Sequence, residues 1–178
     1  MMKSIAGLLM FGGSLFLIGC STSLFPPSVT RDIAPMEFGV LQAQPDVFRG
    51  QVVQLGGRIV GAEETKDGMV IRVQELRVDE HPIYGPSETL HPTAEFAILY
   101  PGKVDPAGVR YGNKLIVVAL AKGSQTVNVD GVPRMEPYVV ARCMHVWKTG
   151  GYGMYGIEDF PHTTDGYWPL EHQTYCSV

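Results

Sequence analysis

The amino-acid sequence predicts an all-β fold: a small antiparallel β-barrel, with a short helix before it and an irregular tail rich in glycine and aromatic residues after it. Segments of alternating apolar and polar residues recur between residues 51 and 147, and turn-forming residues separate them. No long amphipathic helix interrupts these segments. Short antiparallel strands commonly close into a barrel because closure covers their edges, and a sandwich of two sheets is the alternative.

The first predicted hairpin indicates the type of barrel. Residues 51–60 alternate between apolar and polar side chains, residues 66–68 (Lys-Asp-Gly) are typical of a tight turn, and residues 69–78 alternate again. The alternation slips by one residue at positions 74–75, which predicts a β-bulge there. A bulged and strongly curved early hairpin favours the five-stranded OB type of barrel.

Three further strands are predicted over residues 95–100, 115–121 and 138–147. The middle one, Leu-Ile-Val-Val-Ala-Leu-Ala, is apolar on both faces, so we expect it to be the most buried strand. Residues 79–93 contain three prolines and are expected to form a long loop, and the Asp-Gly pair at 130–131 marks a turn.

A short helix is predicted before the first strand. Pro35 suits the first turn of a helix, because its fixed φ matches and its missing N–H group has no helical partner there. Met36, Val40 and Leu41 then share one face, and Pro45 ends the helix.

The start of the chain has the layout of a secretory signal segment. Lys3 is followed by an apolar run of 14 residues from Ile5 to Ile18. This run is too short for a transmembrane helix, which needs about 20 apolar residues to cross a hydrocarbon core of ~30 Å. The alternative is a buried N-terminal helix of a globular domain, and the adjacent glycines Gly12 and Gly13 argue against it.

Leu17, Ile18, Gly19 and Cys20 closely resemble the lipobox of bacterial lipoproteins. We predict that residues 1–19 are a lipoprotein signal peptide, cleaved between Gly19 and Cys20. The thiol of Cys20 would then carry a diacylglycerol and its new amine a further acyl chain, and no other cofactor is expected. Two or more acyl chains give stable membrane anchoring. The alternative is an ordinary cleaved signal with a chance cysteine.

The segment 20–35 is predicted to be a lipidated tether, in which Pro26 and Pro27 favour an extended chain and prevent a helix. By analogy with proteobacterial lipoproteins, Asp at the second mature position favours retention in the inner membrane. Ser21 stands there. The sequence therefore predicts an outer-membrane location, with the domain facing the periplasm.

The net charge and the length of the chain limit its expected partners and its number of domains. Lys3 is the only charged residue of the signal segment, so its removal lowers the 14 basic residues to 13, leaves all 18 acidic residues, and gives a net charge of −5. Nucleic acid is not an expected partner, because no basic run provides a positive footprint. The remaining length suffices for one domain, the OB-like barrel at 36–148, followed by a Gly/Tyr-rich tail at 149–178.

Two cysteines remain besides the predicted lipid attachment site. An exported chain meets oxidising conditions, in which Cys143 and Cys176 can form a disulfide that pins the tail to the domain. The alternative is a buried free Cys143 and an unpaired Cys176, and the sequence does not decide between the two.

No residue pattern indicates an enzyme or a metal site. The glycines of 151–156 match a dinucleotide-binding motif formally, but no helix can begin after them. The acidic pairs at 63–64 and 158–159 are interpreted as solvent-facing charges. The histidines show no close metal-ligand spacing: His81, His91, His145, His162 and His172. The first two lie in the predicted loop and the last two in the tail, where solvated loop residues are the favoured interpretation and a metal site formed by folding is the alternative.

Several short motifs resemble the Slp family of bacterial outer-membrane lipoproteins. The similarity covers roughly residues 36–150, is reinforced by the lipobox, and is carried by these motifs: residues 45–60, Asp105 with Pro106, Tyr111, the apolar strand that follows, and Val146 with Trp147. The resemblance implies an outer-membrane lipoprotein associated with starvation or stationary-phase physiology. It implies no catalytic residues.

The predicted function is therefore a structural or stress-protection role in the cell envelope, with the membrane and an envelope protein as partners. The alternative is a periplasmic module that binds a glycan or small ligand on the barrel face. The tail aromatics are able to stack on sugars, although packing on the barrel is the favoured interpretation: Tyr152, Tyr155, Tyr167 and Trp168.

Overall fold

The computed structural model describes residues 23–79, 85–87, 94–129, 131–149 and 171–177 of the 178-residue chain. Two short α-helices and one 3-10 helix come first: α1 (Pro27–Thr30), α2 (Phe38–Ala43) and η1 (Pro45–Phe48). Six strands follow: β1 (Val52–Thr65), β2 (Gly68–Leu76), β3 (Glu95–Tyr100), β4 (Lys114–Val129), β5 (Val132–Trp147) and β6 (His172–Cys176).

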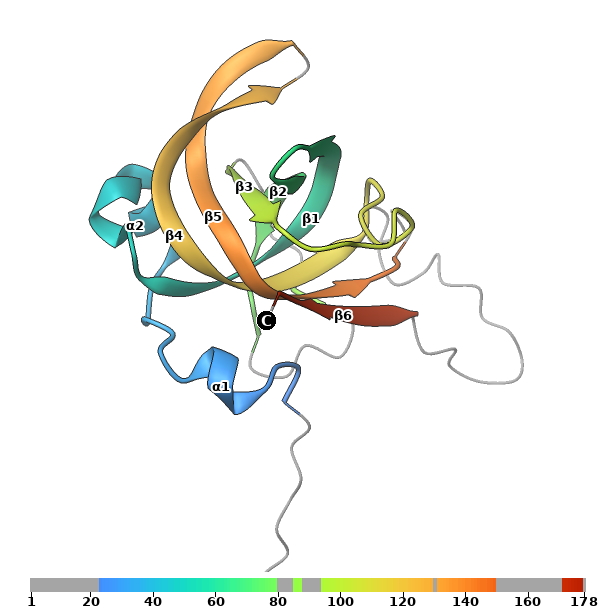
Figure 1. Ribbon diagram of the computed structural model, residues 1–178. Coiled ribbons are helices and arrows are strands. Elements are labelled where there is room, and N and C mark those ends of the chain that lie inside the picture. Colours follow the sequence, from blue (N-terminus) through green and yellow to red (C-terminus); the bar gives the residue numbers. More distant parts are fainter. Residues whose placement is uncertain (1–22, 80–84, 88–93, 130, 150–170, 178) are drawn as a thin grey trace, which may run out of the picture.

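The six strands form one sheet in the order β3–β2–β1–β4–β5–β6, and all these neighbours are antiparallel. In addition, β3 pairs with β5 in parallel, with Ala97 opposite Tyr138. The backbone hydrogen bonds therefore run in a ring through β1 to β5, and β6 extends the sheet beyond β5. Figure 1 shows β4 and β5 as a long curved hairpin that rises past the other strands. The predicted antiparallel β fold with short helices is confirmed.

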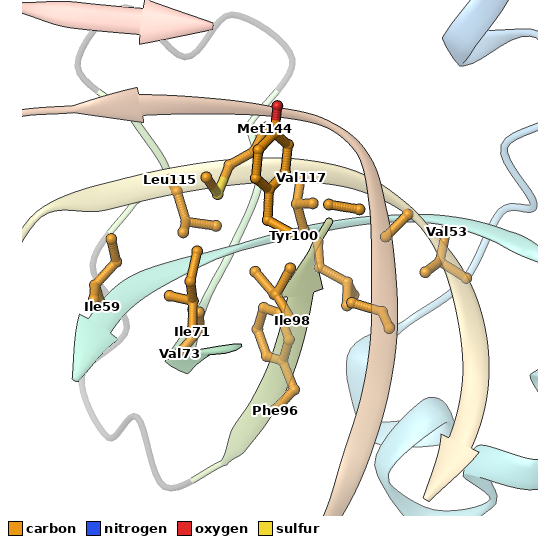
Figure 2. Close-up of a cluster of buried hydrophobic side chains, with 14 of the residues drawn as sticks. Val53, Ile59, Ile71, Val73, Phe96, Ile98, Tyr100, Leu115, Val117 and Met144 are labelled. Atoms are coloured by element: carbon orange, nitrogen blue, oxygen red, sulfur yellow. The ribbon is translucent and has the colours of Figure 1, made fainter. Parts of the chain in front are cut away.

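Both faces of β4 bury apolar side chains, as its sequence predicts. Leu115 and Val117 join the main cluster between the strands, with Ile71 and Phe96 from β2 and β3 (Figure 2). The alternate residues of β4 point the other way and join a second cluster. That second cluster comprises Phe25, Val52, Ile116, Val118, Cys143 and Trp147.

The predicted bulge is in the wrong place. Residues 74–75 pair regularly with β1, and the register shifts instead between Ile59 and Gly61. Leu76 and Val73 are both fully buried, although residues three apart in a regular strand point to opposite faces. Burial of apolar residues on both faces of β2 therefore produced the apparent slip in the sequence.

The elements at the two ends of the domain differ from the prediction. Pro27 begins α1, a position where proline is tolerated, so the expectation that Pro26 and Pro27 prevent a helix is wrong. The one predicted helix exists as α2, but it begins at Phe38 and leaves Pro35 outside. The last described part of the tail, predicted to be irregular, forms β6.

Candidate functional site

The chain from Ser23 onward, shortly after the predicted lipidation residue, is folded against the domain. Phe25 is only 4% exposed in the second cluster, and Leu24 packs beside it. The Ser23 hydroxyl donates a hydrogen bond to the Phe25 carbonyl oxygen at 2.9 Å. Because a residue spans at most about 3.6 Å, the Cα atom of Ser23 lies within roughly 11 Å of that of Cys20. The described part of the predicted tether thus belongs to the folded body instead of forming an extended spacer.

Strand β6, near the C-terminal end of the chain, pairs with β5. Cys143 and Cys176 face each other in the β5–β6 register, and their Sγ atoms are joined at 1.94 Å. Tyr175 is 7% exposed in the main cluster, with its ring centroid 6.1 Å from that of Tyr100. The last described residues are therefore part of the folded domain.

His145 lies within the strand predicted over residues 138–147, and it is buried instead of solvated. It lies on β5, is 4% exposed, and its Nδ1 atom is 2.6 Å from Oγ1 of Thr174 on β6. Its ring centroid is 4.3 Å from that of Trp147 and 5.0 Å from that of His172. Burial and the nearby His172 lower the pKa of His145 to about 4, so this histidine is neutral at neutral pH.

A hollow of about 470 Å³ lies between the β1–β2 hairpin and the β4–β5 hairpin. Arg72 of β2 and Tyr138 of β5 both line it, and the small residue Ala97 of β3 lies between them in the strand register. Burial and the charge of Asp67 raise the pKa of Tyr138, so its phenol stays protonated. Amide and hydroxyl side chains supply much of the remaining lining: Thr65, Gln125, Thr126 and Asn128.

A second cavity of about 410 Å³ is lined by residues of α2, η1, β3, β4 and β5. Glu95 and Glu136 are its acidic residues, and Glu136 is only 7% exposed. Burial raises the pKa of Glu136 most, the charge of Glu95 raises it further, and Arg72 and Arg134 act in the opposite direction. No local sequence pattern marks this pair, because its two members are far apart in the chain.

Several sequence-predicted residues lie outside the described part of the chain. These are the cleavage and lipidation residues Gly19 and Cys20, the glycine motif at 151–156, the acidic pair at 158–159, the tail aromatics Tyr152, Tyr155, Tyr167 and Trp168, and the histidines His81, His91 and His162. Most of the predicted loop at 79–93 also lies outside it.

Within the described ranges, no three His, Cys, Asp or Glu side chains gather as a group that could hold a metal ion. None of the helices in these ranges has the length and apolar character required to cross a membrane.

Comparison with known proteins identifies the family. Neither the search of curated proteins nor the search of solved structures found a match. Residues 17–175 match the family described as "Outer membrane lipoprotein Slp family", and this range includes the lipobox cysteine and all the described strands except the last residue of β6. The chain therefore belongs to the Slp family of outer membrane lipoproteins.

Proposed function

We propose that the mature chain begins at Cys20, carries lipid on that residue, and holds a non-catalytic domain close to the periplasmic face of the outer membrane. The observation that carries this proposal is the burial of Phe25 in the folded body, only five positions after Cys20 in the sequence. A domain tied so closely to the bilayer is suited to contact with other envelope components. Its role is then structural or stress-protective.

The ring of strands supports an OB-type barrel as the form of this domain. In the OB fold, five strands form a partly open barrel with Greek-key connections. Here β1 pairs with both β2 and β4, and the parallel pairing of β3 with β5 completes the ring.

In-cell crosslinking of the lipidated protein, followed by affinity recovery and mass spectrometry, tests the contact role. We expect one abundant and reproducible envelope protein to be recovered with the wild type. The Cys20→Ala variant is the matched control and should lose this adduct, because its domain is no longer held at the membrane. Recovery of the wild-type chain alone, or of equal adducts from both proteins, would contradict the proposal.

A second candidate function is the binding of a neutral glycan in the hollow between the two hairpins. OB-type barrels bind oligosaccharides on one face of the barrel and in the loops that border it. Tyr138 offers an aromatic ring on which a sugar can stack. An oligosaccharide that binds there should raise the melting temperature of the unlipidated Cys20→Ala protein, because it binds only the folded state. Tyr138→Ala should abolish the rise, and Tyr111→Ala, at an exposed position, should not. A flat response across envelope glycans would reject this function.

A further inference from the structure

The outer part of the β4–β5 hairpin carries an exposed methionine. The pairing of β4 with β1 ends at Leu120, and the hairpin continues beyond it as an arm formed by residues 124–129 and 132–137. Figure 1 shows this arm rising past the other strands. Met135 lies on the arm and is 65% exposed. Its thioether is therefore within reach of small molecules dissolved in the surrounding water.

The sulfur atom of Met135 is held in place by the residue opposite it. Thr126 pairs with Met135 in the β4–β5 register. The Thr126 hydroxyl donates a hydrogen bond to Sδ of Met135 at 3.1 Å, and both side chains are exposed. A thioether sulfur is a weak acceptor with two lone pairs, and this hydrogen bond engages one of them. The other lone pair is available to an oxidant that arrives from solvent.

The other methionines in the described ranges are shielded. Met144 is 0% exposed in the main cluster, and Met36 and Met69 are partly buried against that cluster. Oxidation of a methionine converts its apolar thioether into a polar sulfoxide, which disrupts a packed core. At Met135 the same change takes place in water, and the sulfoxide oxygen is a stronger acceptor for the Thr126 hydroxyl than the sulfur is. The fold therefore exposes a methionine whose oxidation leaves the core unchanged.

We propose that Met135 is a modification site, at which the chain takes up an oxygen atom from an oxidant of the peroxide class. The sulfur lone pair attacks one oxygen of hydrogen peroxide and the O–O bond breaks. The departing hydroxide takes the proton from the transferred oxygen and leaves as water, so the sulfur is oxidised by two electrons and the peroxide is reduced by two. The inference deepens the proposed stress-protective role and rests on it only for its use in the cell.

Graded oxidation of the unlipidated Cys20→Ala protein with hydrogen peroxide, followed by peptide mass spectrometry, tests the site. We expect Met135 to be oxidised at least tenfold faster than Met144, and faster than Met36 and Met69, because burial limits the access of the oxidant to their sulfur atoms. Met135→Leu is the matched control, since it removes the sulfur, keeps an apolar side chain and should leave the other three rates unchanged. A rate for Met135 no greater than those three would overturn the proposal.

The melting temperature of the oxidised protein gives a second readout. Oxidation at Met135 should leave it unaltered, because changes at an exposed position have little effect on stability. A fall in melting temperature that follows Met135 oxidation and is absent from the treated Met135→Leu protein would make this reaction damage to the fold and reject a protective site. Both measurements use purified protein, so their failure would reject the oxidation site and leave the location and contact role of the domain to their own tests.

Discussion

Loss of the bond between Cys143 and Cys176 is expected to lower the free energy of unfolding by about 3–4 kcal/mol. The two cysteines are 33 positions apart in the sequence, and the loop-entropy argument gives this magnitude for a loop of that length. Tyr175 is the only buried residue of β6, so apart from the bond the strand depends on this side chain and on its pairing with β5. Without the bond, we expect β6 to separate from β5 and Tyr175 to leave the main cluster.

Urea unfolding of the oxidised and the dithiothreitol-reduced wild type measures this effect. The exposed Cys176 gives the reductant access to the bond. The double variant Cys143→Ala, Cys176→Ala is the control, and its unfolding midpoint should equal that of the reduced wild type and ignore dithiothreitol. Identical midpoints for the oxidised and reduced wild type would show that the bond does not hold β6.

A fall in pH from 7 to 4 is expected to lower the free energy of unfolding by up to about 3 kcal/mol through His145 alone. The pKa of His145 is about 4 in the folded protein, against 6.5 in the unfolded chain. Each unit of difference in pKa corresponds to about 1.4 kcal/mol. Between these two values the unfolded chain binds a proton that the folded chain does not. The contribution of His145 to the free energy of unfolding is therefore complete above pH 6.5 and decreases as the pH falls toward 4.

His145→Asn removes the titrating group and keeps a side-chain amide near Thr174. Its free energy of unfolding should change less between pH 7 and pH 4 than that of the wild type. His172→Asn, at an exposed position on β6, is the control and should keep most of the wild-type pH dependence, because burial, the larger cause of the lowered pKa of His145, is unchanged. Parallel pH profiles for the wild type and His145→Asn would contradict the assignment.

The strands could be predicted because their signals are local. The short, largely apolar run at 95–100 was predicted to be a strand, and β3 has the same bounds in the structure. An apolar run on both faces marked the buried part of β4, whose residues 115–119 are all 0% exposed. Such patterns follow directly from the two-residue period of a strand between a core and solvent, or between two cores.

The candidate site depends on contacts between distant segments, and these leave no local signal. Glu95 and Glu136 become neighbours only through the parallel pairing of β3 with β5, which no turn connects. His145 is buried because β6 returns across β5 after a long intervening segment. In the sequence, β6 is a short and largely polar run, and only its tyrosine and its cysteine suggest that it packs on the domain. The bulge of β1 was misplaced for a related reason, since both faces of β2 bury apolar residues.

The most direct test of the central claim is the intact mass of the protein extracted from cell membranes, with fragmentation of its N-terminal peptide. We predict a chain that begins at Cys20 and carries a diacylglycerol and a further acyl chain on that residue. The Cys20→Ala protein should lack this mass and leave the membrane fraction. A wild-type chain that begins elsewhere or carries no lipid would contradict the account, and so would a Cys20→Ala protein that still partitions into detergent.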